Sequence, residues 1–329
     1  MKVLFVGGTG IISSASSRLC VERGIELFHL RRGQTSRPVP DGIQVLPGDI
    51  RDLASARQAL GDRTFDAVVN WIAFTPAHIE QDLELFRGRT NQYVFISSAS
   101  AYQTPPSSLP VTESTPLDNP FWAYSRDKIA CEERLLRAYR EEKFPFTVVR
   151  PSHTYDRTLF PCHGGYTVVD RMRRGKKVVV HGDGTSLWTL THHRDFAKGL
   201  VGLLGHSGAI AEAIHITSDE WLSWNQIHEL IARAAGTRAQ IVHVSSAVIA
   251  RLDPEWGASL LGDKTHSMIF DNSKIKRLVP GFRAEIPFSR GAEEILAYYD
   301  ADPARRVVDA KLDALTDKLV AIGERALAG

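Results

Sequence analysis

The sequence predicts an α/β protein with a doubly wound parallel sheet, and two observations carry that prediction. Short apolar runs alternate with segments of helical spacing throughout residues 1–152. This alternation is typical of βαβ units, whose parallel strands are covered by helices on both faces. In addition, the first apolar run ends in a glycine-rich turn, "GGTG" at residues 7–10, directly before the first helical segment.

Each element of the first half has its own local signal. Apolar runs predict strands, while helical spacing bounded by a Gly stop or a Pro start predicts helices. The expected strands are residues 2–8, 25–30, 42–49, 65–73, 92–98 and 146–152. The expected helices are residues 11–24, 53–61, 76–86 and 122–142. Together they predict a Rossmann-type sheet.

The second half is less regular. It has a helical pattern at 168–175 and from about Asp195, apolar runs at 177–182 and 212–218, and amphipathic segments at 224–236 and 286–300. We expect a Rossmann-type dinucleotide-binding domain over 1–152, with 190–218 returning to its sheet, and a smaller interleaved C-terminal α/β substrate lobe from 153–189 and 219–300. Residues 301–329 predict a helical tail that packs on the body or on a second subunit.

Composition limits the class of protein. The 329 residues are 43% hydrophobic and 24% charged, with a net charge of +2, which predicts a soluble globular protein. No apolar run has the length of a membrane span, and the N-terminus lacks a signal-peptide pattern, so we expect a cytoplasmic protein and no membrane contact. The near-neutral charge argues against a general affinity for nucleic acid. Three cysteines without CxxC spacing predict free thiols and no metal site: Cys20, Cys131 and Cys162.

The glycine-rich turn predicts a dinucleotide site. Glycines let the backbone turn tightly and let a pyrophosphate approach the N-terminus of a helix, where free N–H groups favour anions. Ser13 stands where the third glycine of the fingerprint would be. A second segment, "GDIRD" after the third strand, is expected near the adenine. The predicted cofactor contacts in these two segments are Gly7, Gly10, Ile11, Ile12, Asp49 and Ile50.

The end of the second strand bears on the choice of cofactor. An acidic residue there favours NAD because it binds the ribose hydroxyls, whereas arginine suits the additional phosphate of NADP. This chain has Arg31 and Arg32. The cofactor is therefore expected to be NAD or NADP, with a preference for NADP unless both arginines are merely solvated loop charges.

Tyr124 and Lys128 share a helix face, since i and i+4 positions lie one turn apart. The pair alone does not distinguish a catalytic acid/base from an ordinary surface helix. The wider sequence does, because it resembles the extended short-chain dehydrogenase/reductases, also called the NAD-dependent epimerase/dehydratase family. The resemblance rests on motifs in the family order, namely "GGTGIIS", "GDIRD", "YVFISSASAYQ", "YSRDK", "VVRPSHTYD", "VVHGDGTSLW" and "NSKIKRLVPGF".

The resemblance implies a catalytic Ser, Tyr, Lys trio at Ser98, Tyr124 and Lys128. A phenol is a poor base at neutral pH, and a nearby ammonium and the nicotinamide charge favour its phenolate. Ser98 would orient the substrate oxygen, and the alternative is that it only caps a strand end. Lys128, Pro151 and His153 are further implied cofactor contacts, and a homodimer pairing through the helix of Tyr124 is implied as well.

Three departures from the family narrow the chemistry. Ala99 and Ser100 stand where dehydratases have an Asp-Glu pair, so the elimination machinery is absent. His153 replaces an asparagine that often contacts the substrate diphosphate. Trp188 replaces an arginine that binds a nucleotide phosphate, and with it a charge-assisted contact is lost. A nucleotide-sugar substrate is therefore less certain than the family name suggests.

The predicted substrate contacts are Ser100, Tyr155, His163 and Trp188. A Cys162–His163 nucleophile has no third partner in the sequence. His192 and His193 fit surface or hydrogen-bonded core positions better than an active site. We therefore expect an oxidoreductase or epimerase acting on a small sugar or nucleotide sugar.

Two other classes compete with an enzyme. The layout also resembles chloroplast stem-loop RNA-binding proteins, and RNA binding predicts a basic stripe with interleaved aromatic residues. The only dense basic run, residues 171–177, lies at a helix end that favours solvated cations, so nucleic acid is not expected. A redox-sensing regulator would be expected to lose Tyr124 or Lys128, and both are present.

Overall fold

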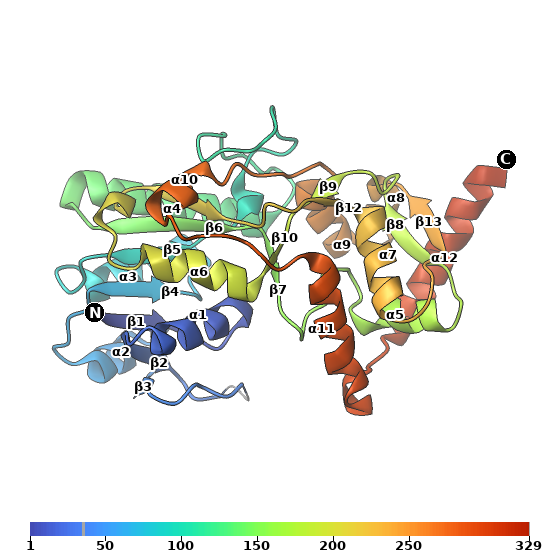
Figure 1. Ribbon diagram of the computed structural model, residues 1–329. Coiled ribbons are helices and arrows are strands. Elements are labelled where there is room, and N and C mark those ends of the chain that lie inside the picture. Colours follow the sequence, from blue (N-terminus) through green and yellow to red (C-terminus); the bar gives the residue numbers. More distant parts are fainter. Residues whose placement is uncertain (35–36, 329) are drawn as a thin grey trace.

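The centre of the protein is a seven-stranded parallel sheet (Figure 1). A computed structural model describes residues 1–34 and 37–328. Every pair of neighbouring strands is parallel. From one edge to the other the strands are β11 (Ala213–Ile216), β6 (Phe146–Pro151), β5 (Tyr93–Ile96), β4 (Ala67–Asn70), β1 (Lys2–Val6), β2 (Glu26–Arg31) and β3 (Gln44–Pro47). The prediction of a doubly wound α/β fold is confirmed.

Helices cover both faces of this sheet because its strands are apolar on both sides. Successive side chains of a strand alternate between faces. Leu4 and Val6 of β1 pack with α2 (Leu53–Leu60), α3 (Pro76–Phe86) and α4 (Ala123–Glu142). Val3 and Phe5 pack with the helices of the opposite layer, which are α1 (Ile11–Glu22), α6 (His193–Leu203) and α10 (Ser273–Leu278).

The order of the strands indicates at which edge of the sheet a ligand is expected to bind. The chain moves outward from β1 through β2 to β3, then crosses back to β4 and moves outward the other way. Doubly wound sheets bind ligands at the carboxyl ends of their strands beside such a switch point. Gly7 follows β1, Trp71 follows β4, Ser97 follows β5 and Ser152 follows β6. The fold therefore brings these four positions to one edge.

A second lobe lies beside this edge and is built from two-stranded sheets and helices (Figure 1). The strand pairs are β7 (His153–Tyr155) with β10 (Leu190–His192), β8 (Val178–His181) with β13 (Ile241–Val244), and β9 (Leu187–Trp188) with β12 (Leu222–Ser223). The helices are α5 (Tyr166–Arg173), α7 (Trp224–Ala234), α8 (Ser246–Leu252), α9 (Pro254–Ser259), α11 (Phe288–Asp300) and α12 (Ala310–Ala328). Short turns of helix are η1 (Ala99–Ala101), η2 (Ser207–Ala209), η3 (Leu260–Lys264) and η4 (Pro303–Arg305).

Several of these elements were not expected from the sequence. The sequence predicts no element over 153–166 or 241–278, yet the first segment begins with β7 and the second forms β13, α8, α9, η3 and α10. These elements are short, so they hold few periods of any hydrophobic pattern. The predicted limits of the two lobes and the tail stay predictions.

Helix α12 explains the dense basic run at 171–177. The helix packs on α5, β8 and β13, and its Leu319 is fully buried. Its acidic residues face the basic run, so that Arg171 is paired with Asp313 and Asp317. The other cations of the run are also paired, in the contacts Arg173–Asp300, Arg174–Asp170, Lys176–Asp317 and Lys177–Glu324. The prediction of solvated cations is therefore wrong for the buried Arg171, whereas Arg174, Lys176 and Lys177 are both paired and exposed to solvent.

None of the helices that the structure describes has the length and apolar character needed to cross a membrane.

Candidate functional site

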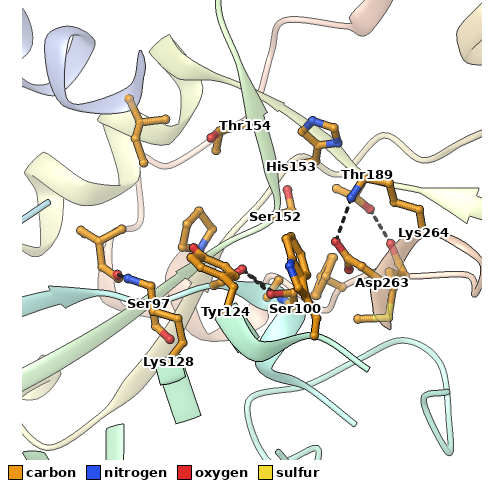
Figure 2. A pocket seen from close by; sticks show the side chains of 18 of the residues that line it. Ser97, Ser100, Tyr124, Lys128, Ser152, His153, Thr154, Thr189, Asp263 and Lys264 are labelled. Atoms are coloured by element: carbon orange, nitrogen blue, oxygen red, sulfur yellow. Dashed lines mark hydrogen bonds and ion pairs between the residues drawn. The ribbon is translucent and has the colours of Figure 1, made fainter. Parts of the chain in front are cut away.

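A cleft of about 410 Å³ opens at the carboxyl edge of the sheet, between the two lobes. Eight predicted site residues line it, namely Ile12, Ser98, Ser100, Tyr124, Lys128, Pro151, His153 and Trp188. Figure 2 shows Tyr124, Lys128 and Ser100 on the side of the first lobe, with His153, Asp263 and Lys264 facing them from the second. We call the side of the cleft that carries Tyr124, Lys128 and Ser100 the first-lobe wall. The side that carries His153, Asp263 and Lys264 is the second-lobe wall.

The glycine turn fits the phosphates of a dinucleotide. Gly7 and Gly8 have φ of +97° and +109°, a region that side chains rarely adopt. A Cβ at Gly8 would also lie 2.6 Å from the His29 ring. The turn is therefore bare backbone at the start of α1, which suits close approach of an anion. Ser13 does not crowd this turn, because its Oγ accepts a 2.7 Å hydrogen bond from the Gly10 N–H.

Lys128 is the buried cation of the first-lobe wall. Its side chain is 2% exposed, and its Nζ donates to the carbonyls of Ala73 and Ile96 at 2.7 and 2.8 Å. Nζ also lies 5.7 Å from the centre of the Tyr124 ring. Burial lowers the pKa of Lys128 to about 8. The backbone at the ends of β4 and β5 thus fixes the ammonium beside the phenol.

Ser98 lies close enough to Tyr124 for its hydroxyl to lower the pKa of the phenol. Burial raises the pKa of the phenol, the Ser98 hydroxyl opposes that rise, and the Asp263 carboxylate adds to it. In the protein without ligands the phenol form is therefore favoured. Any tendency to form the phenolate must come from Ser98 and from positive charge brought to the cleft.

A chain of serine hydroxyls extends from Tyr124 into the interior. The Oγ of the buried Ser125 donates to Ser100 Oγ at 2.8 Å, and Ser100 Oγ lies 2.9 Å from Ser98 Oγ. Ser100 Oγ and Ser98 Oγ share one further hydrogen bond, in which either hydroxyl can donate. Ser98, whose hydroxyl lowers the pKa of Tyr124, is thus linked to the buried Ser125.

A buried ion pair supports this wall from below. Glu132 lies one turn beyond Lys128 on α4 and binds Arg150 of β6 through both carboxylate oxygens, at 3.1 and 2.5 Å. Glu132 also accepts a 2.5 Å hydrogen bond from Ser97 Oγ. Both members of the ion pair are less than 10% exposed. The pair therefore links α4, β5 and β6 where their site residues project.

On the second-lobe wall, Trp188 sets the proton position of His153. The indole Nε1–H of Trp188 donates to His153 Nδ1 at 3.1 Å, so Nδ1 carries no proton. Burial, with the nearby Lys264, lowers the pKa of His153 to about 3. His153 is therefore a neutral imidazole whose proton lies on Nε2, and it can act as a hydrogen-bond donor.

Asp263 and Lys264 complete the second-lobe wall. Their side chains form an ion pair of 3.5 Å, and Lys264 Nζ lies 5.4 and 5.7 Å from the ring centres of Trp122 and Trp188. Burial raises the pKa of Asp263 to about 6. Both residues lie on the π-helix η3, a form of helix that often occurs at functional sites.

Several predicted residues lie outside the cleft lining. Tyr155 is fully buried against Phe288 and His192, and His163 stacks on Trp256 with ring centres 4.3 Å apart. Cys162 is buried, so a nucleophilic role is not supported. The other positions outside the lining flank the glycine turn and the end of β2, and they are Gly7, Gly10, Ile11, Arg31, Arg32, Asp49 and Ile50.

The sequence analysis missed several lining residues, namely Trp71, Phe74, Trp122, Ser152, Thr154, Thr189, Asp263, Lys264, Met268 and Phe270. Trp71 and Phe74 follow β4, and that position at a strand end was a signal that could have revealed them. Asp263 and Lys264 lay in a segment with no predicted element. Within residues 1–34 and 37–328, no group of His, Cys, Asp and Glu could hold a metal ion.

Comparisons with known proteins place the chain in a family. The model of the NAD dependent epimerase/dehydratase family matches residues 3–216. The chloroplast stem-loop binding protein of 41 kDa b from Arabidopsis thaliana is 26% identical over 258 residues, which cover 74% of this chain and 65% of that protein. A UDP-glucose 4-epimerase from Lactobacillus helveticus is 28% identical over 168 residues, covering 46% of this chain and 51% of the epimerase. The chain thus spans less than two thirds of the length of either relative.

Solved structures share the whole fold. An epimerase from Methanothermobacter thermautotrophicus has a TM-score of 0.75 at 18% identity, covering 93% of this chain and 94% of that one. The UDP-glucose 4-epimerase of Bifidobacterium longum, solved with NAD+ and UDP, has a TM-score of 0.74 at 19% identity, covering 92% and 99%. Solved structures at such low identity show only that the fold is shared. The family model matches more than half of the sequence, and this match shows family membership. The chain belongs to the NAD-dependent epimerase/dehydratase family.

Proposed function

We propose that this protein is an NAD(P)-dependent oxidoreductase or epimerase that acts on a hydroxyl or carbonyl group of a sugar. The observation that carries the proposal is the shared lining of one cleft by Ser98, Tyr124 and Lys128. This cleft opens at the carboxyl edge of a doubly wound sheet, beside a glycine turn that suits a dinucleotide. Membership of the family supports the same reaction class.

Each residue of the trio has a distinct task in this proposal. Tyr124 takes a proton from the substrate hydroxyl, or returns one to the carbonyl oxygen. Ser98 donates a hydrogen bond to the same oxygen. Ser98 is itself hydrogen-bonded to Ser100, which is hydrogen-bonded to Ser125. Lys128 keeps a positive charge beside the phenol. When bound, the nicotinamide dinucleotide supplies hydride acceptance and, in an epimerase, hydride return.

The proposed cofactor is NAD, which the family description supports. The preference for NADP predicted from Arg31 and Arg32 stays a prediction. Arg32 is exposed and forms a 3.7 Å ion pair with Asp49, so binding of a phosphate by Arg32 would compete with this carboxylate. If the two arginines bind the 2′-phosphate, the double variant Arg31→Ala and Arg32→Ala weakens NADP binding about tenfold more than NAD binding, because a charge-assisted contact is lost. Equal losses for both cofactors in a titration would contradict that role.

We also propose that nucleic acid is not a ligand of this chain. The relative from Arabidopsis thaliana is described as a stem-loop binding protein, so RNA binding is the alternative function that has to be tested. The dense basic run that would serve such binding is paired with acidic residues of α12 and its neighbours. A labelled RNA stem-loop should therefore bind no more tightly than an unrelated single strand.

A homodimer pairing through α4 is a further proposal. Helix α4 lies against α3, where Arg134 binds Glu80, and it exposes apolar Leu136 on its surface. Light scattering on the purified protein measures the oligomeric state. A monomer at every concentration would reject this proposal without affecting the proposed reaction.

The test of the enzyme proposal begins with the cofactor. The purified protein is denatured, its supernatant is assayed for nicotinamide dinucleotide, and the stripped protein is then titrated with NAD and NADP. Retained cofactor near one per chain would favour an epimerase, since internal recycling needs a cofactor that stays bound. Reversible binding would favour a dehydrogenase or reductase. Failure to bind either cofactor would reject the proposal.

A further inference from the structure

We infer that the second-lobe wall binds an uncharged sugar ring, and that Asp263 and Lys264 recognise two neighbouring hydroxyl groups of that ring. The inference rests on the proposed function and deepens it by naming the substrate class. It separates this chain from proteins whose substrate is held by a nucleotide diphosphate. Four independent features of the cleft support it.

The first feature is the way η3 is fixed from both lobes. The Gly262 carbonyl accepts hydrogen bonds from Asn119 Nδ2 at 2.6 Å and from Thr104 Oγ1 at 3.3 Å. The Lys264 carbonyl is bonded to His181 Nε2 at 2.9 Å and accepts from Ser186 Oγ at 3.2 Å. The backbone that carries Asp263 and Lys264 is therefore held rigidly at the cleft, as a recognition site requires.

The second feature is the charge balance of the cleft. Among the described residues that line it, only Lys128, Asp263 and Lys264 carry charge. Lys128 already donates to two backbone carbonyls, and Lys264 faces the Asp263 carboxylate. The Asp263–Lys264 pair is neutral as a whole, so this lining offers no net charge beyond that of Lys128 to compensate a diphosphate, and Trp188 supplies none. An uncharged substrate has no such requirement.

The third feature is spare hydrogen-bonding capacity. The 3.5 Å separation of Asp263 and Lys264 exceeds the about 2.7–2.9 Å of a good charge-assisted hydrogen bond. The carboxylate can therefore accept from one hydroxyl while the ammonium donates to the next. His153, fixed by Trp188 as an Nε2–H donor, offers a third contact. Neighbouring sugar hydroxyls, which both donate and accept, match this mixture.

The fourth feature is an apolar surface beside the polar groups. The half-buried indole of Trp122 lies next to Tyr124, with ring centres 5.1 Å apart, and also next to Lys264. A flat aromatic ring packs well against the C–H face of a sugar. A ring placed there would lie between the Tyr124 hydroxyl and the Asp263–Lys264 pair, as the reaction requires.

The experiment compares three forms of the same sugar on the full-length protein saturated with NAD. A panel of aldohexoses and aldopentoses is supplied free, as the 1-phosphate and linked to UDP, and UDP alone is included. Binding is followed by the fluorescence of the tryptophans at the cleft. Net oxidation or reduction is followed by the near-ultraviolet absorbance of reduced nicotinamide, and epimerisation by proton NMR of the sugar, because an epimerase leaves the net redox state of its cofactor unchanged. We expect free sugar to bind and react, with an affinity that is unchanged between about 0.05 and 0.5 M salt, because no charge is bound.

The variants Asp263→Asn and Lys264→Met test the residues themselves. Each should weaken binding of free sugar about tenfold, the effect of losing one hydrogen bond to a charged group. The controls are Asp219→Asn and Lys276→Met, which remove one member of an exposed ion pair of 2.9 Å away from the cleft lining and should leave sugar binding unchanged. Melting temperature and NAD affinity are measured for each variant to show that it is folded.

The outcomes separate the two proposals. Binding and reaction of free sugar, lost in the cleft variants only, supports the inference. Reaction of the UDP-linked form alone, or tight binding of UDP, overturns the inference and leaves the proposed function standing. Unchanged sugar binding in Asp263→Asn and Lys264→Met also overturns it. If no form of any sugar is oxidised, reduced or epimerised, the proposed function fails, and this inference fails with it.

Discussion

The two walls of the cleft are built in different ways. The first-lobe wall comes from the end of β5 and the start of α4, and its polar groups are satisfied by one another and by backbone carbonyls. The second-lobe wall gathers His153, Trp188 and the pair on η3 from segments far apart in the sequence, and its ion pair keeps spare capacity. A wall that is internally satisfied suits proton transfer, whereas a wall with open hydrogen bonds suits recognition of a substrate.

The largest expected effect follows from removing the Tyr124 hydroxyl. Because Tyr124 is the proposed acid/base, Tyr124→Phe should lower kcat by about 10³-fold and leave sugar and NAD affinity nearly unchanged. The matched control is Tyr139→Phe on the same helix, beyond the cleft lining. Steady-state kinetics and fluorescence titration make the comparison. A Tyr124→Phe protein that kept a tenth or more of its turnover would assign proton transfer elsewhere.

Lowering the pH should first affect the second-lobe wall, through protonation of Asp263. The pKa of Asp263 is raised to about 6 by burial, so its carboxylate is present above that pH and is protonated below it. Lys264 and Tyr124 face this carboxylate, and the neutral His153 does not titrate in the range. Sugar affinity should therefore fall up to about tenfold per pH unit below pH 6. The measurement is a fluorescence titration between pH 5 and pH 8, with wild type beside Asp263→Asn.

In Asp263→Asn the fall in affinity below pH 6 should disappear, because the carboxylate that is protonated there has been removed. A fall of the same steepness in the variant would assign the pH dependence to another residue.

The serine chain offers a smaller change within the first-lobe wall. Ser125 does not line the cleft, and its side-chain link to the first-lobe wall is the hydrogen bond to Ser100 Oγ. Ser125→Ala should lower kcat about fivefold, leave KM unchanged and move the onset of the basic form of Tyr124 to higher pH. Ser125→Thr keeps the hydroxyl and should restore the pH profile. An unaltered pH profile in Ser125→Ala would show that Ser125 contributes only packing and does not influence Tyr124.

The smallest expected effect concerns the proton position of His153. Trp188→Phe keeps an aromatic ring but removes the indole N–H that holds Nδ1 as an acceptor. The imidazole can then take either tautomer, and sugar affinity should fall about threefold while kcat changes less. The nitrogen chemical shifts of the imidazole report the tautomer directly. If Nε2 remained the protonated atom, Trp188 would not be the residue that sets it.

The difference between the walls also explains what the sequence could predict. The glycine turn, the strand-helix alternation and the Tyr124–Lys128 spacing are local patterns, and the sheet order confirmed the fold that they indicate. Ser98 follows a strand end, so its place at the cleft could be expected from topology. Tyr124 and Lys128 lie on a long helix with repeated periods, and Ser98 and the glycine turn follow strands of the predicted sheet.

Asp263 and Lys264 had no such signal. They lie on a five-residue π-helix whose position depends on Asn119, Thr104, His181 and Ser186, all distant in sequence. Tyr155 shows the reverse error, since an aromatic residue beside a family motif proved to be fully buried core. In both cases the deciding contacts are tertiary, and no local pattern encodes them.

Helix α12 has a consequence for any shortened form of the protein. Its acidic side chains are the counter-ions of Arg171, Lys176 and Lys177. Removing the helix would uncover these cations, together with the apolar groove that holds Leu319. Such a fragment would adsorb polyanions and aggregate, and it would resemble an RNA-binding protein for reasons unrelated to the intact chain. Assays of nucleic-acid affinity are meaningful only with this helix in place.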